Sequence, residues 1–379
     1  MKIKIAHTAD IHIGFKEKKQ HQNFELKQYE LKNTFFKILD TCKNQNIDFL
    51  LISGDLFNDI NISDSDINEI KTAISECRFN VIISPGNHDP FTTDSPYNSQ
   101  WPENVFIFSK NSIDFFEFKE KNVRIYGAAF NDLYEKGNIL NSEINIDENF
   151  INICSLHADL IQNFQNAQSV YRPITCAGIE RSKMDYLALG HIHKRTSILK
   201  AGHTFYSYCG CPEGMGFDEL GEKGFYIGEI SKNYCDLKFQ KICERTYEKV
   251  LIDISEISSD IELKNFIIKK IHEKYQDNYE KNYYYITLTG LCDKDFFVDV
   301  TKLELSLQSL LFFVKVKDET MPAIDLEKLK YQNNIKSTFI KKIMCSIENT
   351  TNPKKKLLLE KALKIGLMSF EKEVLYNED

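Results

Sequence analysis

The chain has 379 residues, 42% of them hydrophobic and 27% charged, and this length predicts two or three globular domains. No apolar stretch approaches the roughly 18 residues that a membrane-spanning helix needs, and the first residues lack the features of a secretion signal. We therefore expect a cytoplasmic protein with no membrane partner. The net charge of −7 argues against a protein that coats nucleic acid by charge alone, although a local cationic site can outweigh a distant acidic face.

Up to about residue 235, short apolar runs alternate with longer mixed segments, which is the pattern of a layered α/β domain. Two of the mixed segments, 29–45 and 63–77, repeat apolar residues at helical spacing, and the second begins with Ser and Asp residues that suit a helix N-cap. The apolar runs, which we expect to be strands, are 3–6, 49–53, 81–84, 123–126, 151–155 and 186–189.

Polar residues that can bind metal follow five of these runs at once. The segments read TADIH, ISGDLFN, SPGNHD, SLHAD and LGHIH. In α/β sheets, ligands gather outside the carboxyl ends of the strands, so the five strands are expected to deliver these side chains to one edge. Residues two apart in extended chain share a face, which predicts that His191 and His193 face one spot and that Asp10 and His12 do the same.

The candidate ligands combine imidazoles with hard oxygen donors, which suits two divalent ions of the Mn, Fe or Zn type better than one structural zinc. Two such ions with two carboxylates keep a positive charge that can hold a phosphodiester anion, and a metal pair can generate hydroxide at neutral pH. Any one of these histidines alone could be a structural residue of the core. The full candidate set is Asp10, His12, Asp55, Asn87, His157, His191 and His193.

His88 lies between Asn87 and Asp89, so it can face phosphate while Asn87 faces metal. As an imidazolium it could stabilise the transition state or protonate the leaving oxygen, and Asp89 could help to keep it charged. Trp101 lies in the polar loop that follows, where it could stack on a base of a nucleic acid or simply anchor the loop. Anchoring is the favoured interpretation.

After about residue 245 the pattern changes to a small βαβαβ unit and then to helices, with a break at ENTTNPKKK. The predicted domains are 1–245, 246–320 and 321–379. In the last of these, 335–343 and 357–367 form apolar faces opposite Lys-rich faces. They could dock on another chain, pack back on the preceding domain or contact DNA phosphates, and docking on another chain is favoured.

The ordered motifs DIH, GD, GNHD, H and GHIH resemble those of the calcineurin-like metallophosphoesterases, and among these the SbcD-type DNA repair nucleases with their YhaO-like branch. The resemblance implies a layered β-sandwich core flanked by helices over 1–245, a small α/β capping domain over 246–320 and a helical partner-binding tail over 321–379. It also implies manganese-dependent cleavage of DNA phosphodiesters, an SbcC-type coiled-coil ATPase bound through the C-terminal helices, and a helical face for a homodimer.

The same resemblance implies a role for each motif residue. One metal would be held by Asp10, His12, Asp55 and His193, and the other by Asp55, Asn87, His157 and His191. Asp55 would bridge the two metals, and His88 would be the catalytic histidine.

One residue departs from the family pattern. Asn58 of GDLFN stands where relatives usually carry Asp or His, which leaves the balance of exonuclease and endonuclease action open. The alternatives to a DNA nuclease are a phosphatase or small-nucleotide phosphodiesterase with the same site, and a catalytically weak scaffold subunit. The chain lacks the GDxxDR and GNHE motifs that mark protein phosphatases, and its ligand series is complete, so a nuclease is favoured over both.

Overall fold

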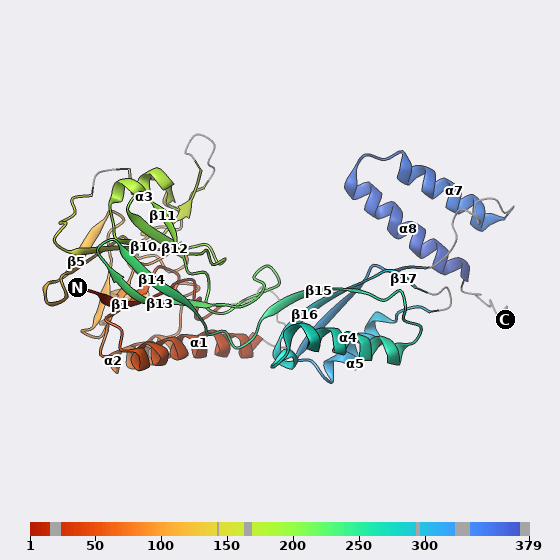
Figure 1. Ribbon diagram of the computed structural model, residues 1–379, viewed down its shortest axis with the longest axis horizontal. Helices are drawn as coiled ribbons and strands as arrows, with labels where there is room; N and C mark the ends of the chain where they lie inside the picture. Colours follow the sequence, from red (N-terminus) through yellow and green to blue (C-terminus); the bar gives the residue numbers. More distant parts are fainter. Residues whose placement is uncertain (16–23, 142–143, 163–168, 293–295, 323–333, 372–379) are drawn as a thin grey trace. The chain divides into compact units, whose positions relative to one another are not determined.

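The computed structural model describes residues 1–15, 24–141, 144–162, 169–292, 296–322 and 334–371 (Figure 1). These residues form two compact units, Met1–Thr246 and Tyr247–Asp379, which are described separately.

Two six-stranded mixed sheets face each other in the first unit. The order of the first sheet is β14(Tyr234–Lys241), β13(Gly224–Ser231), β1(Ile3–Thr8), β2(Phe49–Ile52), β3(Asn80–Ile83) and β4(Val105–Ile107). Strands β1 to β4 are parallel, whereas β13 is antiparallel to β1 and β14 is antiparallel to β13.

The second sheet has four parallel strands in its centre and an antiparallel strand at each edge. The order of this sheet is β11(Leu199–Ala201), β12(Thr204–Tyr208), β10(Tyr186–Gly190), β7(Ile151–His157), β6(Val123–Gly127) and β5(Asp114–Phe118). Two further short strands, β8(Asp159–Leu160) and β9(Pro173–Ile174), pair with each other outside the two large sheets.

Central strands are rich in apolar residues because both of their faces are buried. In β2, Phe49 and Leu51 join the core between the sheets, whereas Leu50 and Ile52 pack under the helices on the outer face. In β10, Tyr186 points into the same inter-sheet core. The continuous apolar runs of the sequence are therefore the central strands of a sandwich.

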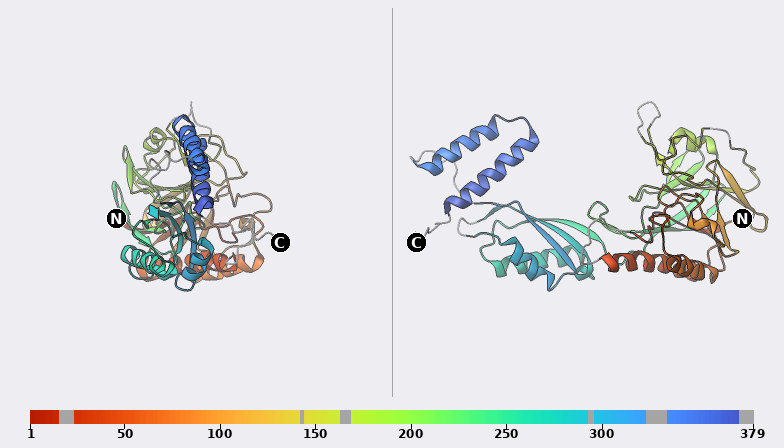
Figure 2. Two further views of the ribbon diagram at one scale, coloured as in Figure 1. Left: turned by 90° about the vertical axis from the view of Figure 1, so that its right-hand side faces the viewer. Right: turned by 180° about the vertical axis from the view of Figure 1, so that it is seen from behind.

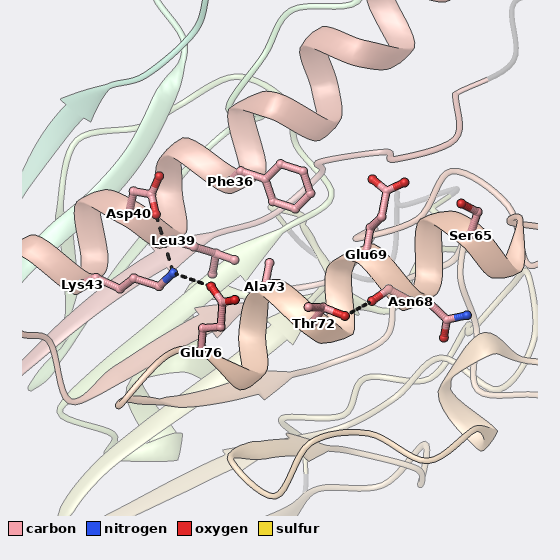
Figure 3. Close-up of a pocket in the computed structure, with 10 residues that line it drawn as sticks. All are labelled: Phe36, Leu39, Asp40, Lys43, Ser65, Asn68, Glu69, Thr72, Ala73 and Glu76. Carbon is pink, nitrogen blue, oxygen red and sulfur yellow. Dashed lines mark hydrogen bonds and ion pairs between the residues drawn. The ribbon is translucent and has the colours of Figure 1, made fainter.

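Helices cover both outer faces of the sandwich, as Figure 1 shows. On the first sheet lie α1(Phe24–Gln45) and α2(Asp64–Ser75), and the Ser63 side chain caps α2 by accepting the Asp66 N–H. The short helix α3(Cys176–Ser182) packs on the second sheet. A groove of about 640 Å³ runs between α1 and α2 (Figure 3).

The predicted fold class, an α/β sandwich flanked by helices, is confirmed. Each of the six predicted strands is present with ends shifted by only a few residues, and the N-cap at Ser63 is where the sequence indicates it. One expectation needs correction. The strands that carry the motifs belong to two sheets, β1, β2 and β3 to the first and β7 and β10 to the second, so the motifs meet between two sheet edges.

The second unit contains a parallel three-stranded sheet of β15(Tyr247–Asp253), β16(Tyr283–Thr289) and β18(Phe313–Asp318). The helices α4(Asp260–Tyr275) and α5(Val300–Gln308) pack on one side of this sheet (Figures 1 and 2). A small pair, β17(Leu291–Cys292) and β19(Met321–Pro322), follows.

The helices α7(Ile335–Glu348) and α8(Pro353–Glu371) form an antiparallel pair around Ile340, Leu363 and Leu367. The break predicted near Pro353 is where α8 begins. Two stretches of the predicted tail, 323–333 and 372–379, lie outside the described residues. Within the described part of the chain, no helix combines the length and apolar character needed to cross a membrane.

Glu213 gives the first unit a pH-dependent stability. Its carboxylate is fully buried, accepts hydrogen bonds from Thr34 and from the Glu244 N–H, and lies 3.7 Å from the Lys27 ammonium. Burial outweighs these partners and raises the pKa of Glu213 from 4.5 to about 7. A carboxyl group whose pKa is higher in the folded than in the unfolded state contributes stability that is fully present below the unfolded-state pKa. This stability is lost as the pH rises through the folded-state pKa.

We therefore expect Glu213→Gln to flatten the pH dependence of unfolding. Between pH 5 and pH 8 the wild type should lose about 2.5 kcal/mol more of its unfolding free energy than the variant, at about 1.4 kcal/mol per pKa unit. Urea titrations at each pH measure this difference, with exposed Glu103→Gln as the matched control. Equal slopes for the wild type and Glu213→Gln would contradict the expectation.

Candidate metal centre

The candidate residues lie where five strands end. Asp10 and His12 follow β1, Asp55 follows β2, Asn87 follows β3, His157 ends β7, and His191 and His193 follow β10. Within each sheet these carboxyl ends lie on one side, because β1, β2 and β3 are parallel, as are β7 and β10. The two sets of ends meet, since His193 Nε2 after β10 lies 3.8 Å from Asp10 Oδ1 after β1. The fold therefore gathers the seven predicted residues between the two sheets.

The turns after β1 and β2 are joined by backbone hydrogen bonds. The Asp10 N–H donates to Gly54 O at 3.0 Å and the His12 N–H to Asp55 O at 3.0 Å. Asp10, His12 and Asp55 have φ values of 54°, 54° and 52°, in the left-handed region that non-glycine residues rarely adopt. Such backbone costs about 1–3 kcal/mol per residue and clusters at functional sites, where the surrounding structure holds it in place.

The expectation that His191 and His193 face one spot was wrong. The strand β10 ends at Gly190, and His191 has a φ of 97°, so the alternation of an extended chain does not continue. His193 Nε2 lies 3.2 Å from His12 Nε2, whereas the His191 ring packs against the His157 ring with centroids 5.1 Å apart. The two histidines therefore belong to different halves of the site.

Two glycines in the motifs allow this close approach. A Cβ on Gly86 would lie 2.1 Å from Asp55 Oδ1, and a Cβ on Gly190 would lie 1.9 Å from the Ser53 carbonyl oxygen. Neither position can accept a side chain without displacing the strand ends that carry the site. This explains the glycines of GNHD and GHIH in physical terms.

The first half of the site contains Asp10, His12 and His193. His193 Nε2 lies 3.8 Å from Asp10 Oδ1, and His12 Nε2 lies 3.7 Å from Asp55 Oδ2. Asp10 also accepts the His191 N–H at 3.1 Å, which ties it to the second half.

The second half is built around His157. Its Nδ1 donates to Ser53 O at 3.0 Å, which leaves Nε2 facing Asp55 Oδ2 at 3.3 Å and Asn87 Oδ1 at 3.0 Å. A backbone acceptor on one ring nitrogen is the usual way to hold a metal-binding histidine in the required tautomer. The same Asp55 oxygen therefore faces both halves of the site.

Burial lowers the pKa of both His12 and His191 to about 3, so these imidazoles are neutral and have a lone pair to offer. His157 behaves differently. Burial opposes its charge, but the neighbouring Asp55 and Asp10 carboxylates raise its pKa to about 9. A divalent ion bound at His157 would therefore displace a proton.

The pKa values of the two carboxylates of the site shift in opposite directions. Burial raises the pKa of Asp10, whereas His157 holds the pKa of Asp55 below its ordinary value in spite of burial. Burial opposes the charge of His193, but its hydrogen bond to Glu219, with the charge of Asp10, raises its pKa to about 9.

These donors fit divalent metal ions. His12 Nδ1 is fully buried and has no hydrogen-bond partner among the described atoms, and the Nε2 atoms of His12 and His193 converge on one point. Carboxylate, imidazole and amide oxygen donors together suit Mn, Fe or Zn. Within each of three groups the ligand atoms lie within 4.8 Å of one another: Asp10–His12–His193, His12–Asp55–His88 and Asp10–Asp55–His157.

His88 is exposed at the lip of the site. Its N–H donates to Asp55 Oδ1 at 3.0 Å, and its ring Nδ1 meets the Asn58 carbonyl oxygen at 3.1 Å. The contact to Asn58 uses the backbone, so it does not depend on the unusual side chain at that position. His88 Nε2 has no hydrogen-bond partner among the described residues.

Asp89 does not have the predicted relation to His88. It is fully buried and accepts the N–H groups of Phe57 at 3.0 Å and Gly86 at 2.8 Å, and the Tyr97 hydroxyl at 2.5 Å. Burial raises its pKa to about 7. Asp89 therefore holds the turns around the site together. This role replaces the expected one, in which Asp89 would help to keep His88 charged.

Trp101 lies on the apolar side of its loop. Its ring packs on Tyr97 and Phe57, with centroids 5.9 Å and 6.5 Å away, and its Nε1–H donates to Pro96 O. These contacts correspond to the favoured interpretation, in which the tryptophan anchors the loop.

Sequence reasoning missed Glu219, which contacts His193 Nδ1 at 2.5 Å. The only signal in the sequence is an acidic residue in a glycine-rich loop 26 residues after His193, and such residues are common on surfaces.

A buried site of two carboxylates, four imidazoles and an amide, between the strand ends of an α/β sandwich, is that of a metal-dependent hydrolase. The model of the calcineurin-like phosphoesterase family matches residues 3–195, just over half of the chain, and the chain belongs to that family.

Three relatives are similar to the chain in sequence. It is 30% identical over 226 residues to the uncharacterized metallophosphoesterase YhaO of Bacillus subtilis, a match that covers 58% of this chain and 54% of YhaO. The chain therefore spans about half the length of that relative. It is 24% identical over 306 residues to the DNA double-strand break repair protein Mre11 of Methanococcus maripaludis, covering 74% of this chain and 72% of that protein. Against Mre11 of Saccharolobus solfataricus the identity is 24% over 344 residues, covering 85% and 84%.

Proposed function

We propose that the protein is a two-metal phosphodiesterase that hydrolyses DNA, and that it serves as the nuclease subunit of a DNA repair complex. The observation that carries the proposal is a carboxylate, Asp55, whose Oδ2 lies 3.3 Å from His157 Nε2 and 3.7 Å from His12 Nε2. A shared oxygen between two donor groups is the arrangement that a metal pair requires. The extent of the likeness to Mre11 proteins supports DNA as the substrate.

In this proposal each half of the site holds one ion. The assignment of residues is Asp10, His12, Asp55 and His193 for one ion, and Asp55, Asn87, His157 and His191 for the other. Manganese is the expected metal, with iron or zinc as alternatives, because all three accept imidazole and carboxylate donors. The pair would supply a hydroxide at neutral pH and stabilise charge on the phosphate oxygens.

The protein's own residues position the substrate. With two divalent ions the two carboxylates leave a formal charge of +2, which attracts a phosphodiester in spite of the net charge of −7 of the chain. His88 at the lip donates to the phosphate or to the leaving oxygen, and the Asn58 carbonyl holds its other nitrogen. The balance of exonuclease and endonuclease action is to be measured, because Asn58 departs from the family pattern.

The test is to incubate the purified full chain with end-labelled duplex DNA and, separately, with a small aryl phosphodiester, each with manganese or with a chelator. Metal-dependent shortening or nicking of the DNA is the expected result. Turnover of the small ester alone would favour a small-nucleotide phosphodiesterase or a nuclease that needs its partner for access to DNA. Bound metal without turnover of either substrate would favour a scaffold subunit.

The C-terminal helices are proposed to bind an SbcC-type coiled-coil ATPase. Several large apolar side chains of α7 and α8 remain exposed although the pair packs around Ile340, Leu363 and Leu367. Ile335 is 78% exposed, Leu358 67% and Ile365 64%. Co-purification with the ATPase, lost in a Leu358→Ser and Ile365→Ser double variant, would support this role.

A homodimer through the nuclease domain is also proposed, with the groove between α1 and α2 as its site (Figure 3). Its apolar floor is formed by Phe36, Leu39 and Ala73, and Lys43 links Asp40 and Glu76 at its rim. Sedimentation of the full chain tests this, since a monomer at all concentrations would exclude the dimer.

A further inference from the structure

The Glu219 carboxylate is held rigidly beside His193. Its Oε2 accepts the Met215 N–H at 2.7 Å and lies 3.5 Å from Cys211 Sγ, and its own N–H donates to Gly216 O at 3.0 Å. Its side chain is only 11% exposed. The loop that carries it therefore presents Oε1 to His193 in one fixed position.

The backbone of the same segment is attached to the His193 backbone. The Cys211 N–H donates to the His193 carbonyl oxygen at 3.3 Å, and Lys223 Nζ reaches the same oxygen at 3.4 Å. The histidine is thus held at both its backbone and its ring by one stretch of chain. Because the Glu219 carboxylate is fixed in place, it accepts the Nδ1–H of His193 in only one orientation of the ring.

The contact of 2.5 Å between His193 Nδ1 and Glu219 Oε1 has a definite chemical consequence. Nδ1–H donates to the carboxylate, and Nε2 is directed toward Asp10 and His12, where a bound ion would replace the Nε2 proton. A carboxylate on the far nitrogen also makes the imidazole a stronger donor to a metal, and removal of such a partner typically costs 10–100-fold in metal affinity.

Among the described residues, neither His157 nor His12 has a carboxylate within hydrogen-bond distance of Nδ1, and the nearest to His157 Nδ1 is Asp10 Oδ1 at 4.0 Å. His157 Nδ1 donates to a neutral carbonyl, that of Ser53, and His12 Nδ1 has no partner among the described atoms. Glu219 therefore adds a negative charge to the half of the site that contains His193, and the described residues place no such carboxylate on Nδ1 of His157.

We propose that Glu219 is a positioning residue that orients His193 and makes the metal site of Asp10, His12 and His193 the tighter of the two. This inference rests on the proposed two-metal function and deepens it. It attributes the unequal affinities of the two ions to a residue that is not itself a proposed ligand and that acts through His193.

Calorimetric titration of the chelator-treated full chain with Mn²⁺ tests the proposal without any substrate. The wild type should show two binding events of unequal affinity. Glu219→Gln keeps an acceptor for the imidazole N–H but loses the charge, and it should weaken the tighter event by about 10-fold. Glu219→Ala loses both the charge and the acceptor, and it should weaken that event by about 100-fold.

Glu222→Gln is the matched control, since Glu222 lies three residues away and pairs with Lys241 at 3.0 Å on the surface. It should bind both ions as the wild type does. Melting curves in chelator confirm that the variants fold. A second readout is the ring nitrogen spectrum of His193, which should show the proton on Nδ1 with a diamagnetic ion bound to the wild type and a mixture of tautomers in Glu219→Ala.

Equal Mn²⁺ affinities in Glu219→Gln, Glu219→Ala and the wild type would overturn the proposal, as would an equal loss at both sites. Failure of the wild type to bind Mn²⁺ would overturn the metal centre and, with it, the role of Glu219. If the wild type binds two ions but cuts no DNA, only the proposed substrate fails, and the graded loss of affinity still supports Glu219.

Discussion

Asp55→Asn is expected to abolish metal-dependent hydrolysis and to lower the affinity for both ions by more than about 100-fold, beyond the loss typical of a group that only supports a ligand. Asp55 Oδ2 faces His157 Nε2 and His12 Nε2, so it is the one side chain proposed to contact both ions. Asparagine has the same shape but replaces one oxygen with an amide nitrogen that cannot bind a cation.

The variant should still fold. Its remaining Oδ1 can accept the His88 N–H that Asp55 accepts at 3.0 Å, and the backbone bonds of Asp55 to Ile11 and His12 do not change. Titration with Mn²⁺ and turnover of an aryl phosphodiester measure the two effects, with exposed Asp94→Asn as the matched control. If Asp55→Asn bound two ions as tightly as the wild type, the shared-carboxylate arrangement would be refuted.

The sequence predicted the strands of this fold well because their burial leaves a simple pattern. In β2, the consecutive residues Phe49 and Leu50 pack into two different cores, so both faces of the strand must be apolar. Helix α2 was predicted equally well, since Ile67, Ile70 and Ile74 recur at helical spacing on one buried face. The motif residues were found because polar side chains directly after such runs have few structural uses.

The sequence did not reveal the arrangement of those motifs around the site. Periodicity assumes that the chain stays extended, but the left-handed backbone at His12 and His191 turns the chain just after each strand. The division of strands between two sheets is also invisible to local patterns, because pairing such as β7 with β10 joins segments far apart in the chain.

Side chains in the loops were the least predictable. The role of Asp89 depends on which way its carboxylate points, and four donors of neighbouring turns decide that: the N–H groups of Asp55, Phe57 and Gly86 and the Tyr97 hydroxyl. Glu219 reaches His193 only because its loop folds back on the strand end. Neither contact follows from spacing in the sequence, since each depends on the tertiary path of a loop.

His88→Gln is expected to separate metal binding from catalysis. The backbone of His88, rather than its ring, donates to Asp55, so replacing the ring leaves that hydrogen bond in place. The variant should bind Mn²⁺ with an affinity within about twofold of the wild type. Its turnover should fall by about 10²–10⁴-fold, the usual contribution of a general acid or base.

The geometry explains why glutamine cannot replace this histidine. The Asn58 carbonyl holds His88 Nδ1 at 3.1 Å, which leaves Nε2 free to deliver a proton to the leaving oxygen. An amide can donate a hydrogen bond at this position but cannot give up a proton. The matched control is His203→Gln, an exposed histidine in the turn between β11 and β12, which should cut at the wild-type rate. If His88→Gln lost metal and activity together, His88 would be a ligand of the centre, and if it lost neither, the proton would have to come from water.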